Sequence, residues 1–180
     1  MQSLSLVLAM GNDILGDDGV GLLAARRLAA RDGVDIVESS EAGLALLEHI
    51  IGYRNLLILD SVKTGKQPPG TVLRYTADDF RTIVAPSPHY AGLPEVLALG
   101  ARLGVSMPSD IRVLAMEVED PYTLREELTP TVHSALAAYV AAAEDILGAW
   151  ASDGEIRPGD PDTCKPHPLT GSFRPAATDA

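Results

Sequence analysis

Apolar positions along this chain form short continuous runs that alternate with stretches of helical spacing. Residues 4–10 (LSLVLAM) are a continuous apolar run of strand length, which is typical of a strand buried on both faces. Apolar residues then recur at helical spacing over residues 20–30, with arginines toward the end, where the helix dipole favours cations. The chain therefore begins with a predicted strand, a turn and a helix.

The same alternation continues to about residue 150. Further strands are expected over residues 34–37, 56–59 (closing on Asp60), 71–76 and 111–119, and further helices over 42–51, 95–103 and 128–150. Thr129 and Pro130 are typical of the N-cap and first position of the last helix. This order predicts an α/β fold of three layers (αβα), with a mainly parallel, twisted sheet of about five strands and helices on both faces.

Length and composition fit one domain, which we expect over residues 1–150. The chain has 180 residues, of which 46% are hydrophobic and 22% charged, enough for a single core. From residue 151 onward it contains five prolines and no apolar periodicity. Residues 151–180 are therefore expected to form a flexible, Pro-rich C-terminal tail.

Charge and cysteine usage narrow the class of protein. The net charge of −11 and the scattered lysines and arginines argue against nucleic-acid binding, which needs clustered cations. The lone Cys164 permits neither an internal disulfide nor a cysteine-based zinc cluster, and it fits the reducing cytoplasm. The first apolar run lacks the flanks of a signal peptide, and no run approaches the roughly 20 residues that span a bilayer. A cytoplasmic protein without membrane insertion is expected.

The turn after the first strand, MGNDILGDDGVG (residues 10–21), is rich in both glycine and aspartate. A glycine-rich turn between a strand and a helix usually binds phosphate, but this spacing matches neither dinucleotide nor mononucleotide motifs. The alternating oxygen ligands and final glutamate of a calcium loop are also missing. Because its carboxylates would repel a phosphate, the turn predicts a cation site.

Ligands of open α/β sheets bind beyond the carboxyl ends of the strands, where the strand order reverses. Asp17 and Asp18 follow the first strand and Asp60 ends the third, so a 2-1-3 strand order would make them neighbours. His89, in a loop stiffened by prolines, is the third candidate ligand. Two carboxylates and an imidazole suit zinc, nickel, cobalt or manganese, and leave coordination positions open for a substrate.

Each candidate also has a structural interpretation. Asp18 is a natural N-cap of the first helix, and Asp17 is typical of a turn hydrogen bond. Asp60 could cap the next loop, and His89 could be a surface or core histidine. The remaining histidines, which lie in helices or in the tail, are interpreted as structural or exposed: His49, His133 and His167.

Four segments resemble the nickel-iron hydrogenase maturation endopeptidases. Residues 11–21 are similar to the family pattern G-N-x-L-x-x-D-[DE]-x-x-G, and LLILDSV, with Asp60, resembles its apolar strand that ends in Asp. SPHYAGLPEVL, with His89, resembles its Ser/Thr-x-His loop ahead of a helix. LTPTVHSAL (residues 128–136) resembles the start of its last helix. The similarity spans about residues 4–148.

The resemblance implies a specific activity. Members of the family remove a short C-terminal peptide from the hydrogenase large-subunit precursor after nickel insertion, and are commonly monomeric. Their nickel-binding residues correspond to Asp18, Asp60 and His89, with nickel carried by the precursor. Two departures stand out: Ala9 replaces a frequent Gly, and residues 38–41 (ESSE) replace a Gly-Gly-Thr turn. The second leaves open which hydrogenase is processed.

No serine or cysteine in the sequence has the context of a catalytic triad, so no covalent acyl-enzyme is expected. In our hypothesis, nickel held by the precursor is also contacted by Asp18, Asp60 and His89, and a water activated by the metal or by Asp17 attacks the scissile bond. The alternatives are a general metallopeptidase with its own zinc and a non-catalytic metal or assembly chaperone.

The tail contains DPDTCKPH (residues 160–167), a loose likeness to the Cys-x-x-His end of hydrogenase large subunits. Through Cys164 and His167 it could occupy the site as a pseudo-substrate. An accidental match is the favoured explanation.

Overall fold

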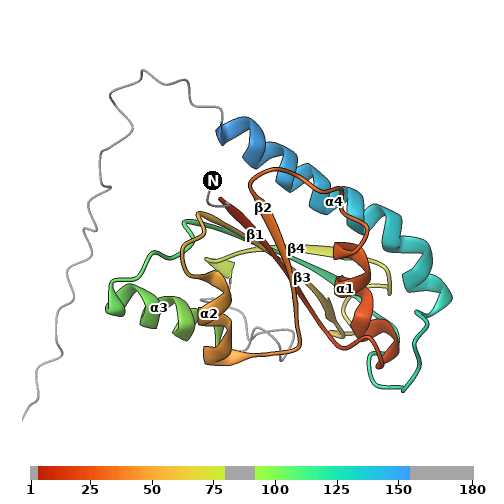
Figure 1. The fold of residues 1–180 in the computed structure, drawn as a ribbon. Helices are drawn as coiled ribbons and strands as arrows, with labels where there is room; N and C mark the ends of the chain where they lie inside the picture. The colour runs from red at the N-terminus through yellow and green to blue at the C-terminus, as the bar shows by residue number, and fades with distance from the viewer. Residues whose placement is uncertain (1–3, 80–91, 155–180) are drawn as a thin grey trace, which may run out of the picture.

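A five-stranded sheet forms the middle layer of the protein (Figure 1). The computed structural model describes residues 4–79 and 92–154. The strand order is β2-β1-β3-β5-β4. Four strands are parallel, β1 (Ser5–Met10), β2 (Val34–Ser39), β3 (Asn55–Val62) and β5 (Asp110–Glu117), and β4 (Val72–Thr76) pairs antiparallel with β5 at one edge. The predicted fold class and the 2-1-3 order are confirmed.

Helices cover both faces of this sheet. One face carries α1 (Val20–Ala25) and the long α4 (Pro130–Gly154), and the other carries α2 (Leu46–Ile50) and α3 (Leu93–Leu103) (Figure 1). Strand side chains alternate between the two faces. In β3, Leu57 and Leu59 pack in the core beneath α1 and α4, while Leu56 and Ile58 pack in the core beneath α2 and α3. The result is the three-layer arrangement expected from the alternating pattern.

Several element boundaries differ from the predicted ones. The first helix ends at Ala25 instead of near residue 30, because the amide of Arg27 bonds the carbonyl of Ala24 and tightens the chain into a turn. The predicted helix 42–51 is a short 3-10 turn, η2 (Gly43–Ala45), followed by α2. The last helix starts at Pro130 as predicted but continues to Gly154, four residues into the segment expected to be tail. The rest of that segment lies outside the described residues.

The reversal of strand order falls between β1 and β3. The chain that follows β1 passes through η1 (Gly16–Gly19) into α1, which contacts both β1 and β3. A Cβ on Gly21 would lie 2.6 Å from the carbonyl oxygen of Leu59 and 2.8 Å from that of Met10. Only glycine permits this approach, which places η1 and its aspartates directly over the ends of the two strands.

None of the helices within residues 4–79 and 92–154 combines the length and the apolar character that crossing a bilayer requires.

Candidate carboxylate site at the sheet edge

Asp18 points from η1 toward the third strand. Its predicted role as N-cap of α1 is wrong: the N-cap is Gly19, and no side chain caps that helix. The 3-10 turn places Asp18 within the helical segment, so its carboxylate is directed elsewhere. Its Oδ1 accepts a hydrogen bond from the hydroxyl of Ser61 at 2.8 Å, and its Oδ2 accepts one from the amide of Asn12 at 2.8 Å. Asp18 is thus fixed from two sides.

Asp60 lies inside β3, which continues to Val62 instead of closing on Asp60 as predicted. The pairing of β3 with β1 nevertheless ends one residue earlier, at Leu59 and Ala9. Asp60 is therefore the first residue of β3 beyond its shorter neighbour. It is fully buried, and its Oδ1 accepts a hydrogen bond from the amide of Ser61 at 2.7 Å. By strand alternation its side chain lies on the face that carries α2 and α3.

Ser61 joins the two carboxylates. Its hydroxyl donates to Asp18 while its backbone amide donates to Asp60, and the serine is almost completely buried. From the sequence, Ser61 had no predicted role, because no serine has the context of a catalytic triad. Its position directly after the strand aspartate was the available indication of a linking role. Side chains of adjacent strand residues point to opposite faces, so such a residue can link groups on both faces. Ser61 therefore orients the pair of aspartates.

Tyr139 of α4 contacts the backbone of Asp60 from the face of the sheet that carries α1 and α4. Its hydroxyl accepts a hydrogen bond from the Asp60 amide at 2.9 Å and lies within donating distance of two carbonyl oxygens, Leu114 at 2.7 Å and Asp60 at 3.0 Å. Burial raises the pKa of Tyr139 well above its ordinary value of 10.0, and the nearby charge of Asp60 raises it further. Tyr139 was not predicted as a site residue, although a tyrosine on the apolar side of a long helix indicates a hydroxyl with a buried partner.

Tyr139→Phe is expected to lower the free energy of unfolding by about 1–3 kcal/mol, because the buried Asp60 amide loses its acceptor. The folded protein holds the phenol proton above the pH at which the unfolded chain releases it. Wild-type stability should therefore fall as pH rises past about 10, and the difference from the variant should narrow. Urea unfolding at pH 8 and above pH 10 measures both effects. Tyr122→Phe, at a 72% exposed position, is the matched control; equal effects of both variants would contradict the assignment.

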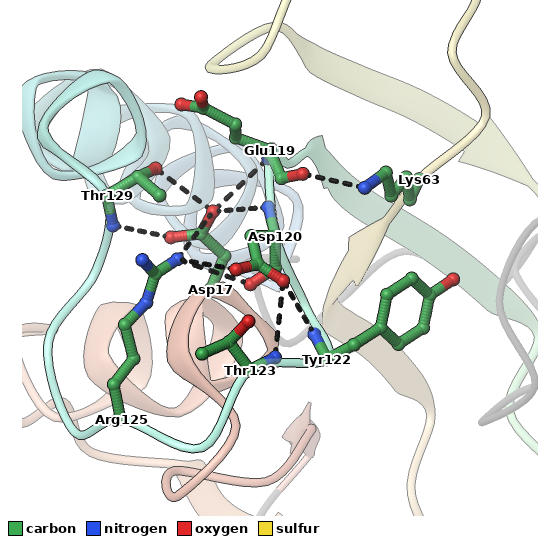
Figure 2. A network of polar contacts seen from close by, with 8 residues as sticks. All are labelled: Asp17, Lys63, Glu119, Asp120, Tyr122, Thr123, Arg125 and Thr129. Carbon is green, nitrogen blue, oxygen red and sulfur yellow. Dashed lines mark hydrogen bonds and ion pairs between the residues drawn. The ribbon is translucent and has the colours of Figure 1, made fainter.

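Asp17 is the centre of a separate network (Figure 2). Its Oδ1 accepts from the amide of Thr129 at 2.7 Å, and its Oδ2 accepts from the Thr129 hydroxyl at 3.0 Å and from the amides of Asp120 and Glu119 at 2.9 and 3.2 Å. Arg125 adds an ion pair at 3.9 Å. Asp17 is fully buried. Both of its oxygens are engaged in holding the segment between β5 and α4, which favours the hydrogen-bonding interpretation of Asp17 over water activation.

The third predicted ligand, His89, lies outside the described residues, as does Ser87. The description resumes at Gly92, directly ahead of α3, which packs on the same face as the Asp60 side chain. Within the described ranges, no three His, Cys, Asp or Glu side chains are grouped closely enough to hold a metal ion. The structure thus brings Asp18 and Asp60 together through Ser61, and the position of His89 stays a prediction.

The other described histidines agree with their predicted structural or exposed roles. His49, on α2, contacts Glu41 at 2.8 Å, and His133 is exposed on α4.

The fold and the site together define an α/β protein with two linked aspartates at the switch point of a mainly parallel sheet, a donor set that suits a divalent cation. A family model described as hydrogenase maturation protease matches residues 20–146. The chain belongs to this family. Its expected activity is thereby confirmed: it is a hydrogenase maturation endopeptidase, of the class that processes the C-terminus of the large subunit.

Individual relatives agree with the family. The hydrogenase 2 maturation protease of Escherichia coli K12 is 29% identical over 157 residues, 83% of this chain and 92% of that protein. The hydrogenase expression/formation protein HoxM of Azotobacter vinelandii is 28% identical over 91% of this chain and 82% of its own length. The structure of the hydrogenase maturating endopeptidase HybD from E. coli superimposes with a TM-score of 0.71 at 27% identity, covering 86% of this chain and 94% of that chain.

Proposed function

We propose that Asp18, Asp60 and His89 recognise nickel in the precursor of a nickel-iron hydrogenase large subunit, so that the C-terminal peptide is removed only after nickel insertion. The observation that carries the proposal is the pair of hydrogen bonds made by Ser61. They hold two carboxylates from distant parts of the chain at the carboxyl ends of the central strands. Both carboxylates are at least nine-tenths buried. Two carboxylates held in one place by the fold are an oxygen donor set that a divalent cation can bind.

In this mechanism nickel belongs to the substrate. Asp18 and Asp60 contribute hard oxygen ligands, and His89 contributes an imidazole, which together suit this ion and leave positions open. Binding the metal at the sheet edge positions the scissile peptide bond beside it. Water then adds to the carbonyl carbon, the C–N bond breaks, and the released amine takes up a proton. Asp17 is assigned to holding the loop that it contacts, because four donors already engage its carboxylate.

Two features bear on the partner and the compartment. The departure from the family pattern at residues 38–41 maps to the end of β2 and the following loop, at the same sheet edge, where Glu38 pairs with Arg26. We propose that this loop helps to select the hydrogenase. One cysteine in 180 residues fits processing in the reducing cytoplasm.

Nickel-loaded precursor is expected to be cleaved, and nickel-free precursor is expected to remain intact. The precursor's C-terminus is followed by mass spectrometry after incubation with purified wild-type protein. Equal cleavage of both forms would remove metal recognition from the mechanism. Cleavage of unrelated peptides by a zinc-containing preparation would indicate a general metallopeptidase, and binding of the precursor without any cleavage would indicate a chaperone.

A further inference from the structure

Three large apolar side chains are exposed on two loops at the carboxyl ends of the parallel strands, where the site lies. Ile14 is 53% exposed, Tyr122 is 72% exposed and Leu124 is 74% exposed. Ile14 lies on the loop between β1 and η1, and the other two lie between β5 and α4. We call these three residues the loop patch. Exposed apolar groups on loops beside a functional site are typical of a docking surface.

The two loops are fastened to each other by their backbones. The amide of Gly16 donates to the carbonyl of Arg125 at 2.8 Å, and the amide of Arg125 donates to the carbonyl of Ile14 at 3.1 Å. This pairing makes Ile14 and Leu124 neighbours across the two loops. The buried Asp17 network holds the second loop at both of its ends, through Asp120 and Thr129 (Figure 2). The patch is therefore held in place before any partner arrives, which lowers the entropic cost of binding.

A hollow of about 300 Å³ opens beside the patch. Ile14, Leu23 and two glycines form its apolar and backbone walls, and Arg26 and Glu126 contribute polar groups. A concavity of this size next to exposed apolar groups suits one anchoring side chain of a partner, the arrangement in which binding energy concentrates.

The border of the loop patch is acidic. Exposed or half-exposed carboxylates lie on the same loops: Asp13, Glu119, Asp120, Glu126 and Glu127. Asp13 is paired with Arg26 and Asp120 with Arg125, so Glu119, Glu126 and Glu127 make the border acidic. The nearby cations are already engaged, since Arg125 pairs with Asp17 and Asp120, and Lys63 contacts the Glu119 carbonyl and the Tyr122 ring. The border therefore favours a partner face that carries lysine or arginine around an apolar centre.

We infer that the loop patch docks the folded body of the large-subunit precursor, through a precursor face that is apolar at its centre and basic at its rim. The inference rests on the proposed function, because it assigns the partner of the same site. Both loops leave the carboxyl edge of the sheet, as Asp18 and Asp60 do, so a body bound there can deliver its C-terminal segment to the aspartates. The loop patch contributes affinity for the precursor, while the aspartates contact the nickel beside the scissile bond.

The triple variant Ile14→Ser, Tyr122→Ser, Leu124→Ser tests this assignment with full-length, nickel-loaded precursor. We expect KM to rise about tenfold or more, with kcat changed less than about twofold, because binding energy is lost without loss of site geometry. Leu103→Ser, which removes a 61% exposed leucine at the end of α3, is the matched control and should leave KM unchanged. Glu126→Lys with Glu127→Lys should also raise KM, most strongly at low salt.

An unchanged KM in the triple variant would overturn the docking assignment. So would a wild-type dimer in sedimentation that the triple variant converts to a monomer, since the patch would then serve self-association. Asp60→Ala is assayed in parallel to separate the two levels of the proposal. If Asp60→Ala is inactive while the triple variant has normal KM, only the docking inference fails; if Asp60→Ala cleaves normally, the proposed function fails.

Discussion

Asp60→Ala is expected to lower precursor processing by about 100-fold or more, to the background of the assay, because a metal-contacting carboxylate would be lost. Asp18→Ala and His89→Ala should have effects of the same order. Asp18 and Asp60 are held by a common serine, so removing either leaves an incomplete oxygen set at the sheet edge. Processing is measured by electrophoresis of nickel-loaded precursor, with initial rates taken at saturating substrate.

Asp60→Asn separates charge from packing. The amide oxygen can still accept from the Ser61 amide, and the side chain keeps its size, so the melting temperature should stay close to that of wild type. Processing should nevertheless fall as far as in Asp60→Ala, because the anionic ligand is gone. Asp32→Asn is the matched control: it removes an exposed carboxylate from the connection between α1 and β2, at the opposite end of the strands, and should process normally. Normal processing by the Asp18, Asp60 and His89 variants would show the assignment to be wrong.

The fold was accessible from the sequence because the strands and helices carry clear periodicities. The continuous apolar runs that end near Met10 and Asp60 are the central strands of the sheet, and the long apolar stretch after Pro130 is α4. The boundaries were less accessible. Local hydrogen bonding ends α1 at Ala25, and pairing with β5 extends β3 to Val62. Neither effect depends on apolar spacing, so the sequence pattern could not show it.

The site was only partly accessible for a related reason. The switch-point rule identified Asp18 and Asp60 as neighbours, since strand order alone determines which strand ends meet. The groups that orient them come from side-chain geometry that a linear pattern does not encode. Ser61 joins the aspartates across two faces of the sheet, and Tyr139 reaches Asp60 from a helix 79 residues later. Taken alone, Asp18 favoured the N-cap interpretation, which is wrong because the 3-10 turn makes Gly19 the cap.

Asp17→Ala is expected to lower the free energy of unfolding by about 3–5 kcal/mol, because two or more donors each lose an acceptor worth roughly 1–3 kcal/mol. The substitution leaves buried donors of Asp120 and Thr129 without their acceptor, and it removes the negative partner of Arg125. The same carboxylate holds the start of α4 and the segment after β5, so both should loosen together. Urea unfolding measures the loss of stability, and hydrogen exchange at the amides of residues 119–129 should show reduced protection in the variant.

Asp17→Asn distinguishes this structural role from water activation. One amide oxygen remains to accept hydrogen bonds while the amide nitrogen faces donors, so the variant should lose about 1–3 kcal/mol and still fold. At a temperature where it is fully folded, its kcat should stay within about threefold of wild type, since a positioning carboxylate has no proton to move. A folded Asp17→Asn protein whose kcat falls about 100-fold would instead make Asp17 the base that activates water. Thr129→Val removes one of the donors to Asp17 and keeps the carboxylate. If Asp17 is the base, this variant should retain full activity, so the two variants together decide which role Asp17 has.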